Sequence, residues 1–245
     1  MPRSTLASVV FLLMLPLLAA AEEPFTPPAP VIGYRLTFEG RIMGLDCTDW
    51  TLAEVTAEGN LLSRCGEYTM ESVKAHHYNV VRMTRQDGQV VAEFLPYAPV
   101  IQFPLKTGAR WSGDYSFYTM ELNEPMKARA ECRVEGLEKV TVPAGKISAY
   151  RIECTDHLGL GSRRLRTQST RWYAPELAAF VKGTNVQDPG RWNFALTGVG
   201  LGETVGPLAS AAGFTEDAVP EPPAALMPNG GNLDQVAPVL DFEDY

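Results

Sequence analysis

Alternation of apolar and polar side chains is the dominant pattern in the central part of the chain. It runs through residues 32–42, 129–135 and 150–154. Successive side chains of a β-strand point to opposite faces of its sheet, so this period predicts strands with one buried and one exposed face. In the first run the apolar positions are Ile32, Tyr34, Leu36, Phe38 and Ile42, and the polar positions between them are Arg35, Thr37, Glu39 and Arg41.

Turn signals separate these runs. Asp87-Gly88 lies between the apolar runs 78–83 and 90–95, and Asp-Gly is a preferred two-residue hairpin turn. The 21 glycines and 19 prolines favour short elements and many turns over a helical bundle. We therefore predict a mainly β protein. Its single antiparallel, strongly curved sheet would have about eight to eleven strands and form a partial barrel or a sandwich.

The N-terminus departs from this pattern. Arg3, an apolar run over residues 6–18 and three alanines at residues 19–21 together predict a signal peptide over residues 1–21 that export removes. The run is too short to cross a bilayer, which takes about 20 apolar residues, and no cysteine stands at the cleavage site. We therefore expect a periplasmic protein with neither a transmembrane segment nor a lipid anchor.

Composition divides the mature chain into three parts. Residues 22–31 hold four prolines and predict an extended linker, and residues 32–205 carry the β pattern. Residues 206–245 hold six prolines and seven acids but no Lys or Arg, which predicts a disordered acidic tail. The tail would either act as a solubilising extension or dock on a partner through Leu240, Phe242 and Tyr245.

The acidity of the chain belongs to this predicted tail. The whole chain has 21 basic and 29 acidic residues. Without the single arginine of the signal peptide and the seven acids of the tail, 20 basic and 22 acidic residues remain. Binding to nucleic acid needs clustered Lys and Arg against phosphates, so we expect no nucleic-acid partner.

Four cysteines in an exported chain favour two disulfides. Cys132 and Cys154 lie on the apolar faces of two runs centred on the turn sequence 143–145, so a hairpin would place them opposite each other. Cys47–Cys65 then follows by elimination, although its midpoint does not coincide with the nearby turn sequence. A zinc site is the alternative, but Cys-x-x-Cys pairs are absent and an oxidising compartment removes thiolates, so we expect no bound metal.

The sequence contains no recognisable catalytic motif. Gly-x-Ser-x-Gly, His-Glu-x-x-His and Cys-x-x-Cys elements are all missing. His76 and His77 are adjacent and would point to opposite faces of a strand, so they would not share a metal ion directly. His157 stands beside Asp156 and close to two glycines, which predicts a turn. We expect no enzymatic activity and no cofactor.

Five side chains are candidates for a ligand or partner surface. Arg164 and Arg166 would share one strand face, where they could grip an anionic group or simply be solvated. Trp111, Trp172 and Tyr173 belong to the aromatic side chains that could either line a cavity in a curved sheet or fill its core.

Three segments together resemble the DUF3108-like domains of exported proteobacterial proteins. They are residues 103–111 (FPLKTGARW), 140–152 (VTVPAGKISAYRI) and 170–182 (TRWYAPELAAFVK), in the order and spacing of that family. Ile147 departs from it, since an aromatic residue is common there, and Ala178-Ala179 replaces its glycine region. The resemblance implies a β-rich envelope domain with a half barrel like that of periplasmic lipoprotein carriers, and it implies no catalytic residue.

Two function hypotheses follow from these observations. The first is a non-catalytic envelope module that binds or assembles with another protein or a surface polymer. The second is a carrier that holds an apolar or amphipathic, lipid-like ligand in the concave face of a half barrel, and it rests on analogy of fold. A deep apolar cavity would favour the carrier, whereas a filled interior would favour the binding module.

Overall fold

The computed structural model describes most of the predicted β-rich domain. The predicted signal peptide lies outside the described residues, as does the predicted tail beyond residue 206, so both stay predictions. Within the described part, no helix is long and apolar enough to cross a membrane. The described residues are 23–120, 122, 124–160, 163–185, 192–202 and 204–206.

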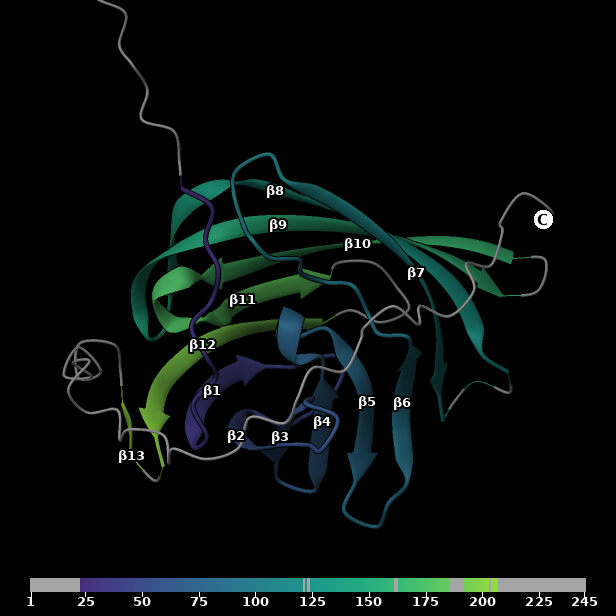
Figure 1. Cartoon of the computed structure of the whole chain (residues 1–245), viewed down its shortest axis with the longest axis horizontal. Helices are drawn as coiled ribbons and strands as arrows, with labels where there is room; N and C mark the ends of the chain where they lie inside the picture. Colours follow the sequence, from purple (N-terminus) through teal and green to yellow (C-terminus); the bar gives the residue numbers. More distant parts are fainter. Residues whose placement is uncertain are drawn as a thin grey trace, which may run out of the picture. The chain divides into compact units, whose positions relative to one another are not determined.

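Thirteen strands of the described chain lie side by side in one antiparallel sheet, each next to its neighbour in sequence (Figure 1). Two short 3-10 helices, η1 (Lys74–His76) and η2 (Pro175–Leu177), interrupt them. The strands are β1 (Tyr34–Gly40), β2 (Asp49–Val55), β3 (Leu61–Cys65), β4 (Tyr68–Ser72), β5 (Val80–Arg85), β6 (Val90–Leu95), β7 (Arg110–Thr119), β8 (Met126–Val142), β9 (Gly145–Leu160), β10 (Arg163–Ala174), β11 (Ala179–Asn185), β12 (Trp192–Leu201) and β13 (Thr204–Gly206).

The sheet is closed, because its first strand pairs with its twelfth. β1 runs antiparallel to β12 over seven residue pairs, from Tyr34 opposite Leu201 to Gly40 opposite Phe194. The predicted mainly β, antiparallel and single sheet is thus confirmed, but the partial barrel or sandwich is corrected to a closed sheet. Alternation identifies a strand and its buried face, but it does not tell which two distant strands meet.

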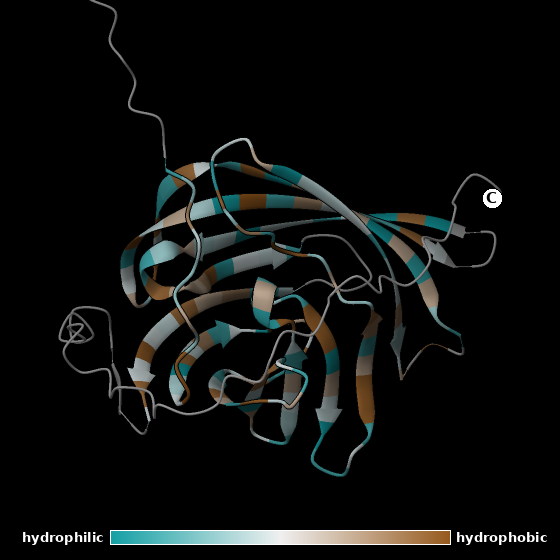
Figure 2. Ribbon diagram, viewed as in Figure 1, coloured by the Kyte–Doolittle hydropathy of each residue, from teal (hydrophilic) through white to brown (hydrophobic). Residues whose placement is uncertain are grey.

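Alternation of buried and exposed side chains follows the strands as predicted, and Figure 2 shows it as alternating hydropathy. From Met126 to Val134 of β8, burial changes at every residue. We call the face that carries the buried side chains the inner face. Among the positions predicted from the sequence, it carries Ala130, Cys132 and Val134 of β8 and Tyr150, Ile152 and Cys154 of β9.

The connection between β6 and β7 passes through the space that the sheet encloses. Residues 96–105, which we call the inner segment, begin at the end of β6 and cross between β5 and the inner face of β8. The N–H of Ala98 donates to the carbonyl of Val80 at 2.9 Å. Ile101 and Leu105 are 0% exposed. The chain therefore fills with its own backbone the space that an open sheet would leave concave and accessible.

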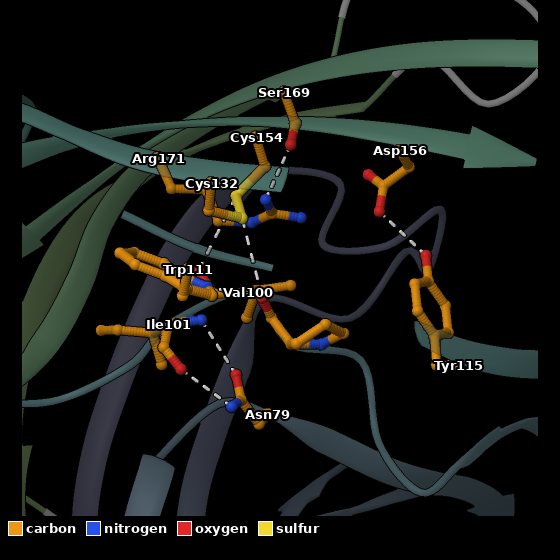
Figure 3. Close-up of a disulfide and its surroundings, with 11 residues drawn as sticks. Asn79, Val100, Ile101, Trp111, Tyr115, Cys132, Cys154, Asp156, Ser169 and Arg171 are labelled. Atoms are coloured by element: carbon orange, nitrogen blue, oxygen red, sulfur yellow. Dashed lines mark hydrogen bonds between the residues drawn. A yellow bond between two sulfur atoms is a disulfide. The ribbon is translucent and has the colours of Figure 1, made fainter. Parts of the chain in front are cut away.

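Asn79 holds the inner segment at its midpoint. Its Nδ2 donates to the carbonyl oxygen of Ile101 at 2.8 Å, and its Oδ1 accepts from the N–H of Ile101 at 2.9 Å (Figure 3). Asn79 itself is 1% exposed. Both backbone groups of a buried residue outside any strand are thus paired, as buried polar groups require.

Within the predicted proline-rich linker, Phe25 is anchored on the inner segment. Phe25 exchanges two backbone hydrogen bonds of 2.8 Å with Leu105 of the inner segment. Its ring centroid lies 6.0 Å from that of Tyr173 and 6.3 Å from that of Phe103. The apolar side chain of Phe25 thus fixes residues that composition alone described as a linker.

Both disulfides join the cysteine pairs expected from the sequence. Cys132–Cys154 connects directly opposed residues of β8 and β9 on the inner face, with 4.1 Å between their Cα atoms. Cys47–Cys65 connects the segment before β2 to the end of β3. Each closes a loop of about 20 residues, which is worth about 3 kcal/mol in the chain-entropy model. Two disulfides fit an oxidising compartment.

Candidate functional site

The five candidate surface residues do not form one site. Trp111 and Tyr173 lie on the inner face of the sheet, whereas Trp172, Arg164 and Arg166 lie on its outer face. Tyr173 is 0% exposed, which corrects its assignment to an accessible surface. β10 runs as one continuous strand, so successive aromatic residues near its end point to opposite faces.

Trp172 is half-buried on the outer face, where charged side chains hold it. Its Nε1 donates to Oε1 of Glu138 on β8 at 2.7 Å. The Nζ of Lys182 on β11 lies 5.1 Å from its ring centroid, a cation–π contact. These contacts cross from β8 to β11 on the outside of the sheet, so Trp172 ties strands together and does not reach the inner face.

Arg164 and Arg166 are exposed on the outer face of β10 and share that face, as predicted. Arg166 is opposite His157 of β9, which in turn is opposite Arg129 of β8. His157 therefore lies within a strand and not in the predicted turn. The pairing of β9 with β10 continues through Gly159, although this glycine was part of the pattern that predicted a turn.

Acidic side chains balance part of this outer basic surface. Nη1 of Arg129 donates to Oδ1 of Asp114 at 3.0 Å, and its Nε lies 3.6 Å from Oε1 of Glu131. Nε2 of His157 lies 3.9 Å from the other oxygen of Glu131. The pairs are exposed, and exposed ion pairs contribute about 0–1 kcal/mol each.

A cleft of about 220 Å³ opens beside Trp111, where β6 ends and β7 continues. One wall consists of residues 111–114 of β7, and the other consists of parts of the inner segment together with His76 and Asn79. The lining is mixed, with backbone, amide, imidazole and carboxylate groups beside proline and tryptophan. It differs from the predominantly apolar lining that small-molecule pockets usually have.

The edge of β7 is open along this cleft. β8 pairs with residues 110–117 of β7, but β6 pairs only with residues 116–119. In the described chain, no strand lies beside residues 110–115 on the β6 side. The first half of β7 is therefore a sheet edge inside an otherwise closed sheet.

The direction of the backbone groups along this edge follows from the ladder with β8. The N–H of Val134 on β8 donates to the carbonyl of Ala109 at 2.9 Å. Antiparallel strands alternate residues that bond to one neighbour with residues that bond to the other. Arg110, Ser112 and Asp114 therefore direct their N–H and C=O groups away from β8, and these groups have no backbone partner among the described residues.

The inner segment keeps β6 apart from this half of β7. Nε1 of Trp111 donates to the carbonyl oxygen of Pro99 at 2.9 Å. A Cβ added at Gly113 would lie 3.0 Å from Cγ of Pro99, so a glycine allows the proline ring to pack directly on the strand. This packing covers the inner face of β7, while the unpaired edge on the β6 side borders the cleft.

His76 contributes an imidazole to the opposite wall. Its Nδ1 accepts from the N–H of Phe103 at 3.4 Å, and burial lowers its pKa. The carboxylate of Asp114, on the β7 wall, is paired with Arg129. The cleft thus presents hydrogen-bonding groups more than net charge, which suits a peptide backbone better than an ion.

Trp111 is the residue of this site that the sequence predicted as a candidate; the others were not predicted. The residues that matter most are Ser112 and Asp114, whose contribution is their backbone, and Asn79, which comes from another element. One feature of the strands indicates the open edge. β6 has six residues and β7 has ten, so β6 cannot cover the whole length of β7.

Comparisons with known proteins add no function. No family model and no curated protein matches the chain. The hypothetical lipoprotein YmcC from Escherichia coli (K12) is similar in structure, with 10% identity, a TM-score of 0.44, and coverage of 66% of this chain and 84% of its own. A predicted exported protein with a YmcC-like fold from Bacteroides fragilis NCTC 9343 has 11% identity, a TM-score of 0.43, and coverage of 72% and 99%.

A predicted lipoprotein from Parabacteroides distasonis ATCC 8503 is similar at the same level. It has 11% identity and a TM-score of 0.41, with coverage of 73% of this chain and 100% of its own. Likenesses of this strength carry no argument about what the chain does. The resemblance to DUF3108-like domains stays a prediction, because no family model matches.

Proposed function

We propose that the protein is a non-catalytic periplasmic binding module that takes an extended segment of an envelope protein as an added strand along β7. The observation that carries this proposal is the open edge at Arg110, Ser112 and Asp114. In strand addition, main-chain hydrogen bonds supply affinity, and pockets for alternate side chains supply specificity. Three outward-directed residues at alternate positions match a partner strand of about five residues.

The position of this edge favours a specific partner. An unprotected sheet edge would pair with any extended chain, and natural proteins normally cover or shorten such edges. Here the edge is recessed in the cleft, and the opposite wall carries His76, Gln102 and Tyr97. A partner must fit between the two walls, so side chains of the inner segment would select it.

The filled interior supports a binding module over a lipid carrier. Ile101 and Leu105 lie within the enclosed space and are 0% exposed. Asn79, which precedes β5, holds the backbone of Ile101 through two hydrogen bonds. An apolar ligand of any length would have to displace this segment and break its hydrogen bonds. Strand addition at the edge requires no such rearrangement.

The chemistry of the cleft supports a non-catalytic role. Catalysis by acid–base or nucleophilic routes needs a reactive group within hydrogen-bond reach of a partner that activates it. The imidazole of His76 is committed to a backbone N–H, and the carboxylate of Asp114 is committed to Arg129. A periplasmic location rests on the predicted signal peptide together with the two disulfides.

A matched pair of variants at one position tests the proposal. Ser112→Pro removes one N–H from the open edge, and proline is tolerated at strand edges, so pairing with β8 should persist. Ser112→Ala changes the side chain and leaves the backbone intact. A photo-crosslinking residue at Gln102, on the opposite wall, would report partner capture in living cells.

The wild-type protein and Ser112→Ala should give the same discrete adduct from Gln102, and Ser112→Pro should give none. The same crosslinker at Thr141, exposed on the outer face of β8, should give no such adduct. Protein fragments identified in the adduct should map to one extended segment. An adduct of equal yield in Ser112→Pro, with the melting temperature unchanged, would rule out strand addition at this edge.

A further inference from the structure

Two charged side chains lie on the inner face on either side of the Cys132–Cys154 disulfide, Arg171 on one side and Asp156 on the other (Figure 3). Asp156 of β9 is opposite Ala130 of β8, and Arg171 of β10 is opposite Ile152 of β9. Ala130 and Ile152 are buried on the inner face. Residues directly opposite each other share a face, so both charged side chains point into the enclosed space.

Arg171 is fixed by a stack of aromatic rings. Its guanidinium carbon lies 5.0 Å from the ring centroid of Trp192, which stacks on Phe194 with a centroid distance of 5.9 Å and an interplanar angle of 17°. Phe194 in turn occupies the place of a side chain at Gly183, where an added Cβ would lie 2.4 Å from its ring. Glycine at this position therefore makes room for the stack that orients the guanidinium.

The hydrogen bonds of Arg171 leave most of its donor capacity unused. Nη1 donates to Oγ of Ser169 at 2.7 Å. The other N–H groups of the guanidinium have no hydrogen-bond partner among the described residues. A guanidinium offers five donors in a planar fork, so donors remain for a second, bidentate partner.

Asp156 is held in the same incomplete way. The hydroxyl of Tyr115 on β7 donates to its Oδ1 at 2.9 Å. Tyr115 reaches across β8 because the intervening inner positions, Ala128 and Ala130, carry small side chains. In the described part of the chain, the second carboxylate oxygen of Asp156 accepts no hydrogen bond.

The two charges influence each other without forming a direct ion pair. Burial raises the pKa of Asp156 and lowers the pKa of Arg171, and in each case the opposite charge offsets part of this effect. Because Asp156 and Arg171 are half-buried and incompletely paired, the fold is less stable than it would be with apolar side chains at these two positions. Such groups are concentrated at binding and catalytic sites.

We infer that Asp156 and Arg171 form a binding site for a small zwitterion, such as an α-amino acid, with its carboxylate on Arg171 and its ammonium group on Asp156. The planar guanidinium matches a carboxylate in a bidentate arrangement. The unused oxygen of Asp156 accepts from an ammonium group. A simple anion would be repelled by Asp156, and a simple cation would be repelled by Arg171, so only a ligand with both charges satisfies both residues. The site does not use the backbone groups of the β7 edge, although Tyr115, which holds Asp156, comes from the same strand.

A series of three related probes tests the inference on the unmodified protein. Calorimetric titration would compare L-phenylalanine with N-acetyl-L-phenylalanine, which lacks the ammonium group, and with L-phenylalaninamide, which lacks the carboxylate. The zwitterion should bind, and each blocked compound should bind at least about tenfold more weakly. Failure of L-phenylalanine to bind at concentrations up to about 10 mM, or equal affinity for all three compounds, would overturn the inference.

Two variants assign the charges to the residues. Asp156→Asn should abolish the preference for L-phenylalanine over the N-acetyl compound, and Arg171→Gln should abolish the preference over the amide. Glu153→Gln, on the outer face of the same strand as Asp156, should leave both preferences intact. Preferences that persist in a folded Asp156→Asn or Arg171→Gln protein would place the ligand elsewhere. The comparison among probes on the wild-type chain decides the inference even where a variant does not fold.

Discussion

Replacing Asn79 by alanine tests whether the inner segment is held as described. The change removes two hydrogen bonds, of 2.8 and 2.9 Å, between the amide and both backbone groups of Ile101. Ile101 is 0% exposed, so water does not replace the lost partner. A net loss of about 1 kcal/mol for each hydrogen bond, increased by leaving a buried donor and acceptor unpaired, gives a destabilisation of about 3 kcal/mol.

The expected effect is large enough to measure by thermal or urea unfolding of the oxidised protein. For a domain of 150–250 residues, 1 kcal/mol corresponds to about 2–4 °C, so Asn79→Ala should lower the melting temperature by about 6–12 °C.

Asn60→Ala provides the matched control, because the Nδ2 of Asn60 also makes one side-chain hydrogen bond, of 2.7 Å to Glu71, but at a partly exposed position. The control should cost less than about 1 kcal/mol. If Asn79→Ala costs no more than the control, Asn79 does not fix the inner segment and the interior is not filled in the way we infer.

Three further predictions concern the core. Tyr173→Phe should raise the free energy of unfolding by about 1 kcal/mol, because its buried hydroxyl has no hydrogen-bond partner among the described residues. Tyr34→Phe loses a 2.9 Å hydrogen bond to a backbone carbonyl and should lower the free energy of unfolding by about the same amount; the opposite order in denaturant unfolding would contradict both assignments. Cys132→Ala should lower the free energy of unfolding by about 2–5 kcal/mol. Free thiols in a non-reducing peptide map of the exported protein would refute the disulfide assignment. Burial lowers the pKa of His77, so below about pH 6.5 the unfolded chain binds more protons than the folded chain. The free energy of unfolding should therefore decrease as the pH is lowered from about 7 to 5, and His77→Asn should reduce this dependence on pH. A pH dependence that is unchanged in His77→Asn would contradict the prediction.

Sequence reasoning was accurate where the determining interactions are local. The period of two predicts which residues of β8 and β9 are buried, and a short turn fixes which residues face each other. The Cys132–Cys154 pairing follows from both. Closure of the sheet depends on the contact between β1 and β12, which are far apart in sequence, and no local pattern encodes it. Phe25 was assigned to a linker for the same reason, since only its partner at Leu105 shows that it is anchored.

The candidate sites were less predictable, because they depend on register and on what is missing beside a strand. Ser112 has no chemical distinction in the sequence, and its importance comes from where β6 stops. Asp156 and Arg171 face the same space because β9 stays paired with β10 through His157 and Gly159, where the sequence predicted a turn. Arg164 and Arg166, which looked more prominent, lie on the solvated outer face.

Residue-resolved amide hydrogen exchange along β7 tests the central claim most directly. In the protein alone, the amides of Arg110, Ser112 and Asp114 should exchange fast, while those of Trp111 and Gly113, directed to β8, should exchange slowly. Adding the partner segment recovered by crosslinking should slow the three open-edge amides by at least about tenfold and leave the other two unchanged. Open-edge amides that are already protected in the protein alone, or that the bound segment does not slow, would contradict strand addition at β7.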